Sequence, residues 1–246
     1  MNSRFIILGI VCLLISGVQS MYGQQYDGTS GLIHVPTADI SDELTVRVGG
    51  HYLNVGMVPS GFQYNGKTYE TYSYYIGFTP LSCLEVSYTE VLFKTKKTYS
   101  DQVGYYQKDR HFSFKISPFT EGVYMPLIAI GVQDPFNQEW TGERGSQHYT
   151  NYYLAVTKHC DLTIGRIGGH ITYRRYNSNT HNDHWNGFVG GVDFRPSCCP
   201  MWRLICGYNG DDILVGSDLL LWRLLMLQVS MLDGRFSGGV GLSIQL

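Results

Sequence analysis

The C-terminal stretch 233–246, DGRFSGGVGLSIQL, decides the fold because its side chains alternate between two kinds. Successive side chains of a strand point to opposite faces of the sheet, so every second residue shares a face. One face is apolar and consists of Phe236, Val240, Leu242, Ile244 and Leu246. The other face is small or weakly polar and consists of Ser237, Gly239, Gly241, Ser243 and Gln245. A soluble sheet would carry charges on that second face, whereas small polar residues are typical of a crowded barrel interior.

Similar alternating runs of about ten residues fill the rest of the chain, separated by Gly, Pro, Asn and Asp. Asp233-Gly234 predicts a tight hairpin turn between the last two runs. No window keeps an apolar 3.6-residue stripe between helix caps, so we expect almost no helix. The weakest break is at 217–222, where Gly216-Ser217-Asp218 is the only turn signal. The predicted strands are residues 43–53, 69–78, 83–93, 110–117, 124–132, 148–157, 161–174, 187–195, 201–209, 211–217, 222–231 and 235–246.

The connections between these runs alternate in length, which indicates how the sheet is arranged. The long ones are residues 54–68, 94–109, 133–147 and 175–186, and the short ones are residues 79–82, 118–122, 158–159 and 196–200. An up-and-down barrel has this alternation when one end faces the cell exterior and the other the periplasm, whereas a Greek-key sandwich does not. We therefore predict an all-β protein, a single antiparallel up-and-down transmembrane β-barrel of about twelve strands over residues 43–246.

The first 23 residues are typical of a secretory signal peptide. Arg4 supplies a positive charge, residues 5–18 are mostly apolar, and small residues follow. The alternative is a transmembrane anchor, but the apolar run is short for a span of about 20 residues. Cleavage after Ser20 and cleavage after Gly23 both fit this pattern; we assign residues 1–23 to the signal peptide and expect residues 24–42 to form an N-terminal lead that can tuck into the barrel lumen. The expected location is the outer membrane of a Gram-negative bacterium.

The composition of the chain fits an exported sheet protein. Lys and Arg number 18 against 20 Asp and Glu, so the net charge is −2 and no basic patch suggests nucleic acid as a partner. Aromatic residues make up 14% of the chain, and 29 residues are glycine. This combination suits pleated sheet with interfacial aromatic belts.

Five motifs carry a resemblance to a known family. They are GTSGLIHVPTA at 28–38, GVQD at 131–134, YLAVTK at 153–158, YNGDD at 208–212 and LDGRF at 232–236. In their order and spacing the chain resembles the YjbH-like family of bacterial outer-membrane proteins. The resemblance implies an outer-membrane β-barrel associated with production or export of extracellular polysaccharide. The implied partners are outer-membrane lipid, with polysaccharide and other secretion components as further candidates.

Eight charged or titratable residues fall on the strand faces that we assign to the interior. They are Arg47, His51, Glu85, Lys115, Arg166, His170, Asp193 and Arg195. Charges inside a narrow barrel must pair with one another or be wetted. They could line a route for an anionic sugar, but paired filling of a closed lumen is the interpretation that we favour.

Four cysteines lie at predicted short turns on the periplasmic side, namely Cys83, Cys160, Cys198 and Cys199; Cys206 lies within a strand. The compartment is oxidising, so we consider a disulfide between neighbouring turns as one hypothesis and free thiols packed at turn ends as the other. A mass change on reduction would distinguish the two.

Two further motifs have both a ligand-binding and a structural interpretation. The stretch 181–185 (HNDHW) could supply metal ligands, but we interpret it as a solvated loop because no strand or helix fixes its geometry. Asp211-Asp212 could bind calcium, but a type I′ hairpin turn at Asn209-Gly210 accounts for the same residues. We therefore expect no metal and no cofactor.

For function the sequence leaves three hypotheses. The first is a non-enzymatic outer-membrane component associated with exopolysaccharide secretion or cell-surface assembly. The second is an outer-membrane enzyme acting on lipid or glycan, although no nucleophile elbow marks a catalytic serine and no catalytic residue is predicted. The third is a soluble periplasmic β-protein that binds a ligand, which fractionation without detergent would reveal.

Overall fold

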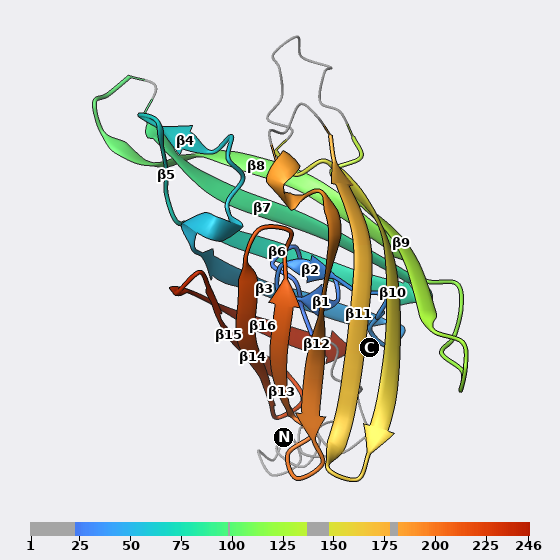
Figure 1. The fold of residues 1–246 in the computed structure, drawn as a ribbon. Coiled ribbons are helices and arrows are strands. Elements are labelled where there is room, and N and C mark those ends of the chain that lie inside the picture. The colour runs from blue at the N-terminus through green and yellow to red at the C-terminus, as the bar shows by residue number, and fades with distance from the viewer. Residues whose placement is uncertain (1–22, 98, 137–147, 178–181) are drawn as a thin grey trace, which may run out of the picture.

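The computed structural model describes residues 23–97, 99–136, 148–177 and 182–246. Within these ranges, twelve antiparallel strands form a closed barrel (Figure 1). Each strand pairs with the next along the chain, and β16 pairs with β3 from Gly238–Tyr52 to Gln245–Thr45. The strands are β3 (Thr45–Leu53), β6 (Thr71–Leu81), β7 (Leu84–Lys96), β8 (Val103–Ile116), β9 (Leu127–Gln133), β10 (Asn151–Leu162), β11 (Gly165–Tyr176), β12 (Gly187–Pro196), β13 (Trp202–Tyr208), β14 (Ile213–Leu221), β15 (Leu225–Leu232) and β16 (Arg235–Gln245). The predicted fold class is confirmed.

The two faces of the barrel wall follow the alternation in the sequence. On β16 the apolar row from Phe236 to Ile244 is exposed, while Ser237 is buried in the interior. On β15 Leu227, Val229 and Met231 are exposed, and Gln228 and Ser230 are buried between them. The outer surface of the barrel is therefore apolar and its lumen polar, which is the reverse of a soluble protein.

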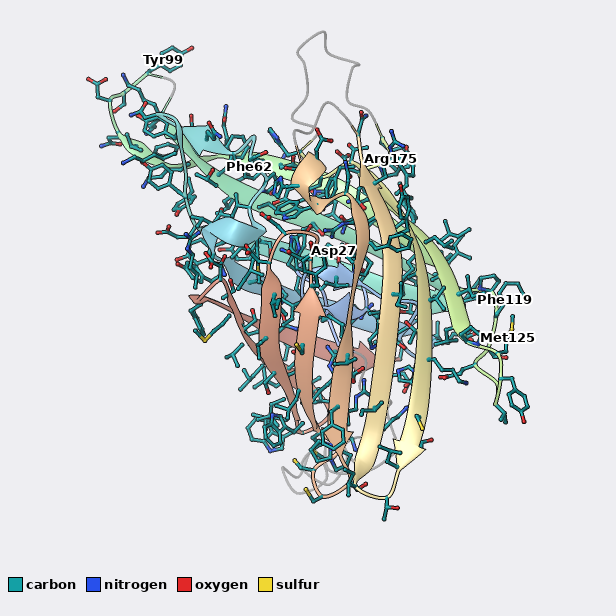
Figure 2. All side chains as sticks on the ribbon, viewed as in Figure 1. Asp27, Phe62, Tyr99, Phe119, Met125 and Arg175 are labelled. Carbon is teal, nitrogen blue, oxygen red and sulfur yellow. The ribbon has the colours of Figure 1, made fainter. Side chains whose placement is uncertain are left out.

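Two of the predicted connections differ from the structure. The 94–109 connection is largely strand, because β7 and β8 continue to the pair Lys96–Val103 and leave only residues 97–102 between them. The 118–122 connection is longer than predicted, because β9 begins at Leu127 and residues 117–126 lie outside the strands. Figure 2 shows Tyr99 at the far end of the β7–β8 hairpin and Phe119 and Met125 in the 117–126 connection. The strict alternation of loop lengths therefore fails at these two positions.

Three predicted turns are also corrected. Lys158-His159 is not a turn, since β10 runs to Leu162 and pairs there with Gly165 of β11. Ser217-Asp218 lies within β14, and the turn falls at Trp222-Arg223, whose φ angles are 51° and 58°. The predicted type I′ turn at Asn209-Gly210 is wrong, because only Gly210 has a positive φ there. Instead, the side-chain oxygen of Asn209 accepts hydrogen bonds from the backbone N–H groups of Asp211 and Asp212. By contrast, Asp233 and Gly234 both have positive φ.

Residues 24–41, which we call the plug, lie inside the barrel. Almost all of them are buried, and they contain the short hairpin of β1 (Gly31–Leu32) and β2 (Val35–Pro36), drawn in blue in the lumen in Figure 1. Leu32, Ile33 and Val35 form an apolar core with side chains of the barrel wall. The predicted cleavage of residues 1–23 falls almost entirely outside the described residues and stays a prediction.

The long connections supply further cover at the end of the barrel opposite the short turns. They contain the 3-10 helix η1 (Val55–Met57), the hairpin of β4 (Gln63–Tyr64) and β5 (Lys67–Thr68), and the 3-10 helix η4 (Asp183–Trp185). Met57 and Trp185 are buried, and Met57 belongs to the same apolar core as the plug. In the described part of the chain, no helix is long and apolar enough to cross a membrane.

Candidate functional site

The contacts between the plug and the barrel wall form the candidate functional site, and Glu85 of β7 lies at their centre. Its carboxylate accepts hydrogen bonds from the backbone N–H groups of Ser30 (2.9 Å) and Ser41 (2.8 Å) and from the Ser30 hydroxyl (2.5 Å). It also pairs with Arg47 of β3 at 2.9 Å and with Lys115 of β8 at 2.8 Å. All of these charged side chains are buried. A wall carboxylate thus binds the plug on both sides of its hairpin, at Ser30 just before β1 and at Ser41, the last residue of the plug.

A second contact joins the plug to the opposite part of the wall through Arg203 of β13. Its guanidinium pairs with Asp218 of β14 and donates a hydrogen bond to the backbone oxygen of Gly31 at 3.0 Å. Gln228 of β15 connects the other oxygen of Asp218 (2.9 Å) to the backbone oxygen of Gln24 (2.9 Å). These buried groups are satisfied only when the plug is present, because two of the acceptors belong to it.

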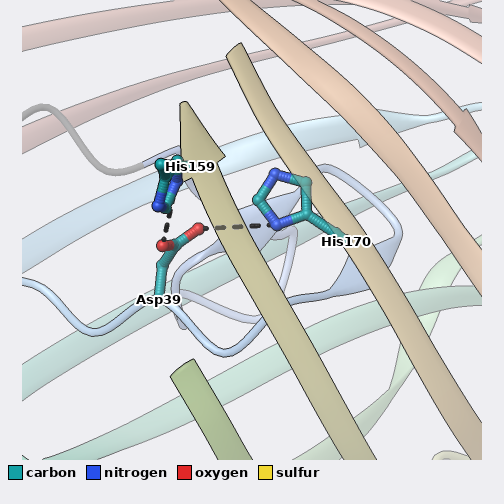
Figure 3. Close-up of side chains that lie close together, drawn as sticks. All are labelled: Asp39, His159 and His170. Atoms are coloured by element: carbon teal, nitrogen blue, oxygen red, sulfur yellow. Dashed lines mark ion pairs between the residues drawn. The ribbon is translucent and has the colours of Figure 1, made fainter. Parts of the chain in front are cut away.

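The third contact brings Asp39 of the plug next to two wall histidines, His159 of β10 and His170 of β11 (Figure 3). Asp39 Oδ1 lies 3.5 Å from His159 Nε2, and Asp39 Oδ2 lies 3.8 Å from His170 Nδ1. Each histidine turns its other ring nitrogen to a carboxylate. His159 Nδ1 is 2.8 Å from Glu121 Oε2, and His170 Nε2 is 2.8 Å from Asp193 Oδ1.

Thr157, His170 and Asp193 form a hydrogen-bonded chain like the nucleophile, base and acid of a hydrolase. Thr157 Oγ1 is 2.9 Å from His170 Nδ1, and the other ring nitrogen of His170 is 2.8 Å from Asp193 Oδ1. Thr157 is only 1% exposed, however, and its oxygen already accepts the backbone N–H of Ala38 at 3.0 Å. A substrate carbonyl cannot approach this hydroxyl while the plug covers it.

The tip of the plug ends in a buried aromatic cluster beneath the long connections. His34 stacks on Tyr26, with ring centroids 5.3 Å apart, and meets Trp185 of η4 edge-on at 4.7 Å. Burial lowers the pKa of His34 well below its usual value, and Arg174 adds to the effect. Burial likewise raises the pKa values of Tyr26 and Tyr149. All three side chains are therefore neutral near pH 7, and the lumen is closed here by apolar packing.

A family model described as exopolysaccharide biosynthesis protein YbjH matches residues 23–212. The chain belongs to this YjbH family. The match begins at the plug and extends over strands β3 to β13, whereas Asp218 and Gln228 of the second contact lie beyond it.

Two solved structures are similar in outline to this YjbH-family chain. The outer membrane phospholipase (OMPLA) dimer of Salmonella typhi with bound calcium is 10% identical, covers 82% of this chain and 90% of its own, and has a TM-score of 0.38. Outer membrane phospholipase A of Escherichia coli is 9% identical and has a TM-score of 0.37, and the match covers 83% of this chain and 97% of the phospholipase. Scores this low carry no argument about activity. No curated protein matches the chain.

The structure places the eight predicted interior residues of the YjbH-family chain in two groups. The six buried ones are Arg47, His51, Glu85, Lys115, His170 and Asp193. His51 lies 2.8 Å from the side-chain oxygen of Gln228. Arg166 and Arg195 are less buried, with Arg166 3.7 Å from Glu121 and Arg195 3.6 Å from Asp193. They extend the network of the third contact rather than line an empty channel.

The cysteines take no part in this network. Cys83, Cys160, Cys198, Cys199 and Cys206 are all free thiols. Cys160 lies within β10 rather than at a turn, and it is exposed. The structure gives the disulfide hypothesis no support, and mass spectrometry with and without reductant remains its test.

The HNDHW motif is only in part the solvated loop that we predicted. His181 lies outside the described residues. Asn182 and Trp185 are buried, because the Asn182 side chain bonds to the Ser60 and His148 backbones and Trp185 covers His34. In the described residues this motif supplies no metal cluster.

Sequence reasoning missed Asp39, Glu121, His159, Arg203 and Asp218 as site residues. Strand alternation could have placed Arg203 on the inner face of β13, since its neighbours Trp202 and Leu204 are exposed. His159 and Asp218 were missed because both were assigned to turns. For Asp39 and Glu121 no local pattern was available, because both lie outside the barrel strands.

Asp134, just after β9, provides a pH-dependent prediction. Burial raises its pKa from 3.8 to about 6, with Asp109 also raising it and His111 opposing. The folded protein therefore binds this proton more tightly than the unfolded chain, so the group's contribution to stability falls as the pH rises from about 4 to above 6. Asp134→Asn, which keeps an acceptor for Thr150 and suits the positive φ, is expected to stabilise the protein by about 1 kcal/mol at pH 8 and little at pH 4.

The measurement is urea unfolding in detergent micelles at both pH values. Asp161→Asn serves as the control, since the Asp161 side chain is 87% exposed. An Asp134→Asn effect of the same size at pH 4 and pH 8 would contradict the prediction.

Proposed function

We propose that this protein is a non-enzymatic outer-membrane barrel that takes part in exopolysaccharide secretion or cell-surface assembly and is held closed by its plug. The observation that carries the proposal is the Glu85 contact, where a buried wall carboxylate holds Ser30 and Ser41 of the plug in a chain of this family. A polymer could pass only after these contacts break. The protein then acts as a gated component rather than as an open pore.

Three features support a membrane location. The sheet is closed, so no strand edge is left unpaired, as hydrocarbon requires. Its outer surface exposes apolar side chains on successive strands, among them Ile130, Ile171 and Val240. Tyr72, Tyr74, Tyr152 and Phe188 are also exposed on the outer face, and some of them fit an interfacial aromatic belt. Outer-membrane lipid is therefore the first proposed partner.

A non-enzymatic role is favoured by how the lumen's reactive groups are used. Glu85 pairs with Arg47 and accepts hydrogen bonds from the plug, and Asp218 pairs with Arg203, which also donates to the plug. The Thr157 hydroxyl accepts the backbone N–H of Ala38. None of these groups is open to a lipid or glycan substrate while the plug is in place. Purified protein is expected to be inert towards both.

The test of this function is deletion of the gene followed by quantification of surface polysaccharide. We expect polymer at the cell surface to fall while the outer membrane stays intact to detergents and to large antibiotics. Complementation with the full chain should restore it. Unchanged polymer in the deletion strain, or hydrolysis of lipid or glycan by the pure protein, would contradict the proposal.

The lipid-facing surface has a prediction of its own. Ile171 lies near the middle of β11 with 63% of its surface exposed, so Ile171→Arg would place a charge against hydrocarbon. We expect the free energy of unfolding from lipid vesicles to fall by about 2–4 kcal/mol. Tyr99→Arg, at an exposed hairpin tip, is the control and should change it by less than about 0.5 kcal/mol. Equal effects of the two variants would argue that lipid does not cover β11.

A further inference from the structure

The cluster of Asp39, His159 and His170 has the composition and arrangement of a metal site. One ligand atom from each residue lies within 4.8 Å of the others. The three side chains are 4%, 6% and 0% exposed. They come from three separate parts of the chain, the plug, β10 and β11, and Figure 3 shows the Asp39 carboxylate between the two histidines, with one oxygen towards each. In the described residues this is the one group of three or more possible ligands that meets these distances.

The two histidines are oriented as metal ligands are. A metal-bound imidazole almost always donates its second N–H to a carboxylate or carbonyl oxygen, which fixes the ring and the tautomer. Here both histidines have such a partner at 2.8 Å, Glu121 for His159 Nδ1 and Asp193 for His170 Nε2. With those nitrogens protonated, His159 Nε2 and His170 Nδ1 carry the lone pairs, and that of His170 Nδ1 accepts the Thr157 hydroxyl at 2.9 Å, a bond that an ion would replace.

Asp39 is the residue that lacks a partner. Its Oδ2 accepts a hydrogen bond from the Thr37 hydroxyl at 3.0 Å, whereas the buried Oδ1 accepts none among the described residues. The nearest cationic candidate, His159 Nε2, is 3.5 Å away, too far for a good hydrogen bond. A buried carboxylate oxygen without a donor is costly, and a cation between Asp39 and the histidines would satisfy it.

Room for the cluster depends on Gly168 of β11, which pairs with His159 across the sheet. A Cβ atom at this position would lie 2.2 Å from Asp193 Oδ1, 2.9 Å from His170 Nε2 and 3.0 Å from His159 Cδ2. Any side chain here would push both histidines and their carboxylate out of place. A glycine at position 168 therefore leaves the space that His159, His170 and Asp193 occupy.

We propose that Asp39, His159 and His170 bind one divalent transition-metal ion, with zinc as the best fit, and that this ion fastens the plug to β10 and β11. Two imidazoles and one carboxylate suit zinc and its neighbours in the series, whereas calcium and magnesium prefer oxygen ligands alone. Zinc bonds of about 2.0–2.2 Å place ligand atoms about 3.3–3.5 Å apart. The separations of 3.5 and 3.8 Å run from the two different oxygens of Asp39, and the three ligand atoms lie within 4.8 Å of one another, so a bound ion would draw them together by up to about 1.5 Å. A fourth position is left for water or the Thr157 hydroxyl.

The test is titration of the purified full chain, in detergent and stripped with a chelator, with Co²⁺ and then with Zn²⁺. We expect one equivalent of Co²⁺ to give the visible absorption of a four-coordinate site, and Zn²⁺ to displace it. Bound Zn²⁺ should also raise the urea unfolding midpoint, because the metal binds only where plug and wall are together. Neither readout depends on polysaccharide, so failure here leaves the proposed function standing.

Four variants make the assignment specific. Asp39→Asn, His159→Gln and His170→Gln should each weaken Co²⁺ binding at least 10-fold and remove the zinc-induced shift, and Gly168→Ala should weaken binding by displacing the histidines. His111→Gln is the matched control, a buried luminal histidine that pairs with Asp109 at 3.0 Å and lies against the Tyr149 ring, and it should bind Co²⁺ like the unaltered chain. Each variant is first checked for the mobility change of a folded barrel on unboiled gels.

Two results would overturn the proposal. One is that the unaltered protein takes up no more Co²⁺ or Zn²⁺ than the same protein, or His111→Gln, does in the presence of excess chelator. The other is full binding by both Asp39→Asn and His170→Gln. In either case the cluster is a hydrogen-bond network between the histidines and the carboxylates, without a metal.

Discussion

Replacing Glu85 with alanine is expected to reduce the free energy of unfolding by about 3–5 kcal/mol. The substitution leaves the Arg47 guanidinium and the Lys115 ammonium buried without the carboxylate that compensates them. It also removes the acceptor for two backbone N–H groups of the plug, those of Ser30 and Ser41. Loss of one partner from a buried ion pair costs far more than the net value of the pair, because the remaining charge stays desolvated.

The measurement is urea unfolding in detergent micelles, combined with limited proteolysis of the plug. Glu90→Ala is a closely matched control, since Glu90 lies on the same strand and also pairs with two cations, Lys108 at 2.6 Å and Arg110 at 3.0 Å. That network lies on the outer side and is partly exposed, so its loss should cost less than about 1 kcal/mol. We also expect faster cleavage within residues 24–41 in Glu85→Ala alone. Equal stability of the two variants would show that the plug is not held by Glu85.

Removal of the plug is expected to have the largest effect on permeability. In the full chain, Leu32, Ile33 and Val35 occupy the lumen together with Tyr26. A variant that lacks residues 24–41 keeps all twelve strands that close the barrel in the described structure, so it should still fold. We expect it to conduct ions in planar bilayers, in steps that the full chain does not produce, because water can fill the vacated polar interior.

The control for this deletion is the shift in gel mobility between unboiled and boiled samples, which reports a folded barrel. A folded deletion variant that conducts no ions would mean that the long connections, with Trp185 and Met57, close the barrel by themselves. Substitution of Trp185 in the deletion background would then test that second closure. The gated role of the plug in polymer passage would lose its basis.

The three plug contacts have a common design. Each places a charged or polar wall residue against backbone or side-chain groups of the plug, at Glu85, at Arg203 and at the two histidines. Charged contacts of this kind are weak sources of net stability, but they specify one arrangement and can be exchanged for water or for another ligand. An apolar seal alone would offer no such exchange. These contacts hold the plug in a defined place, and the proposed gated function requires that they can be broken.

The strands, their order and their two faces could be predicted from the sequence because they depend on local information. Alternation with a period of two fixes which side of β16 faces outward, and Asp233-Gly234 fixes the hairpin before it. The same alternation placed Glu85, His170 and Asp193 in the interior. Where alternation is interrupted, as at His159 and Asp218, the same reasoning assigned turns in place of strands.

The sequence by itself determined strands with one apolar and one polar face, since neighbouring residues decide both properties, whereas closure depends on the distant pairing of β16 with β3. Only the tertiary structure decided which interior groups meet. Asp39 lies beside His159 and His170 because the plug folds inside the lumen. Glu121 lies beside His159 because the 117–126 connection is longer than predicted and lies against β10. Residues so far apart along the chain share no periodicity, and their contacts exist only once the barrel has closed around the plug.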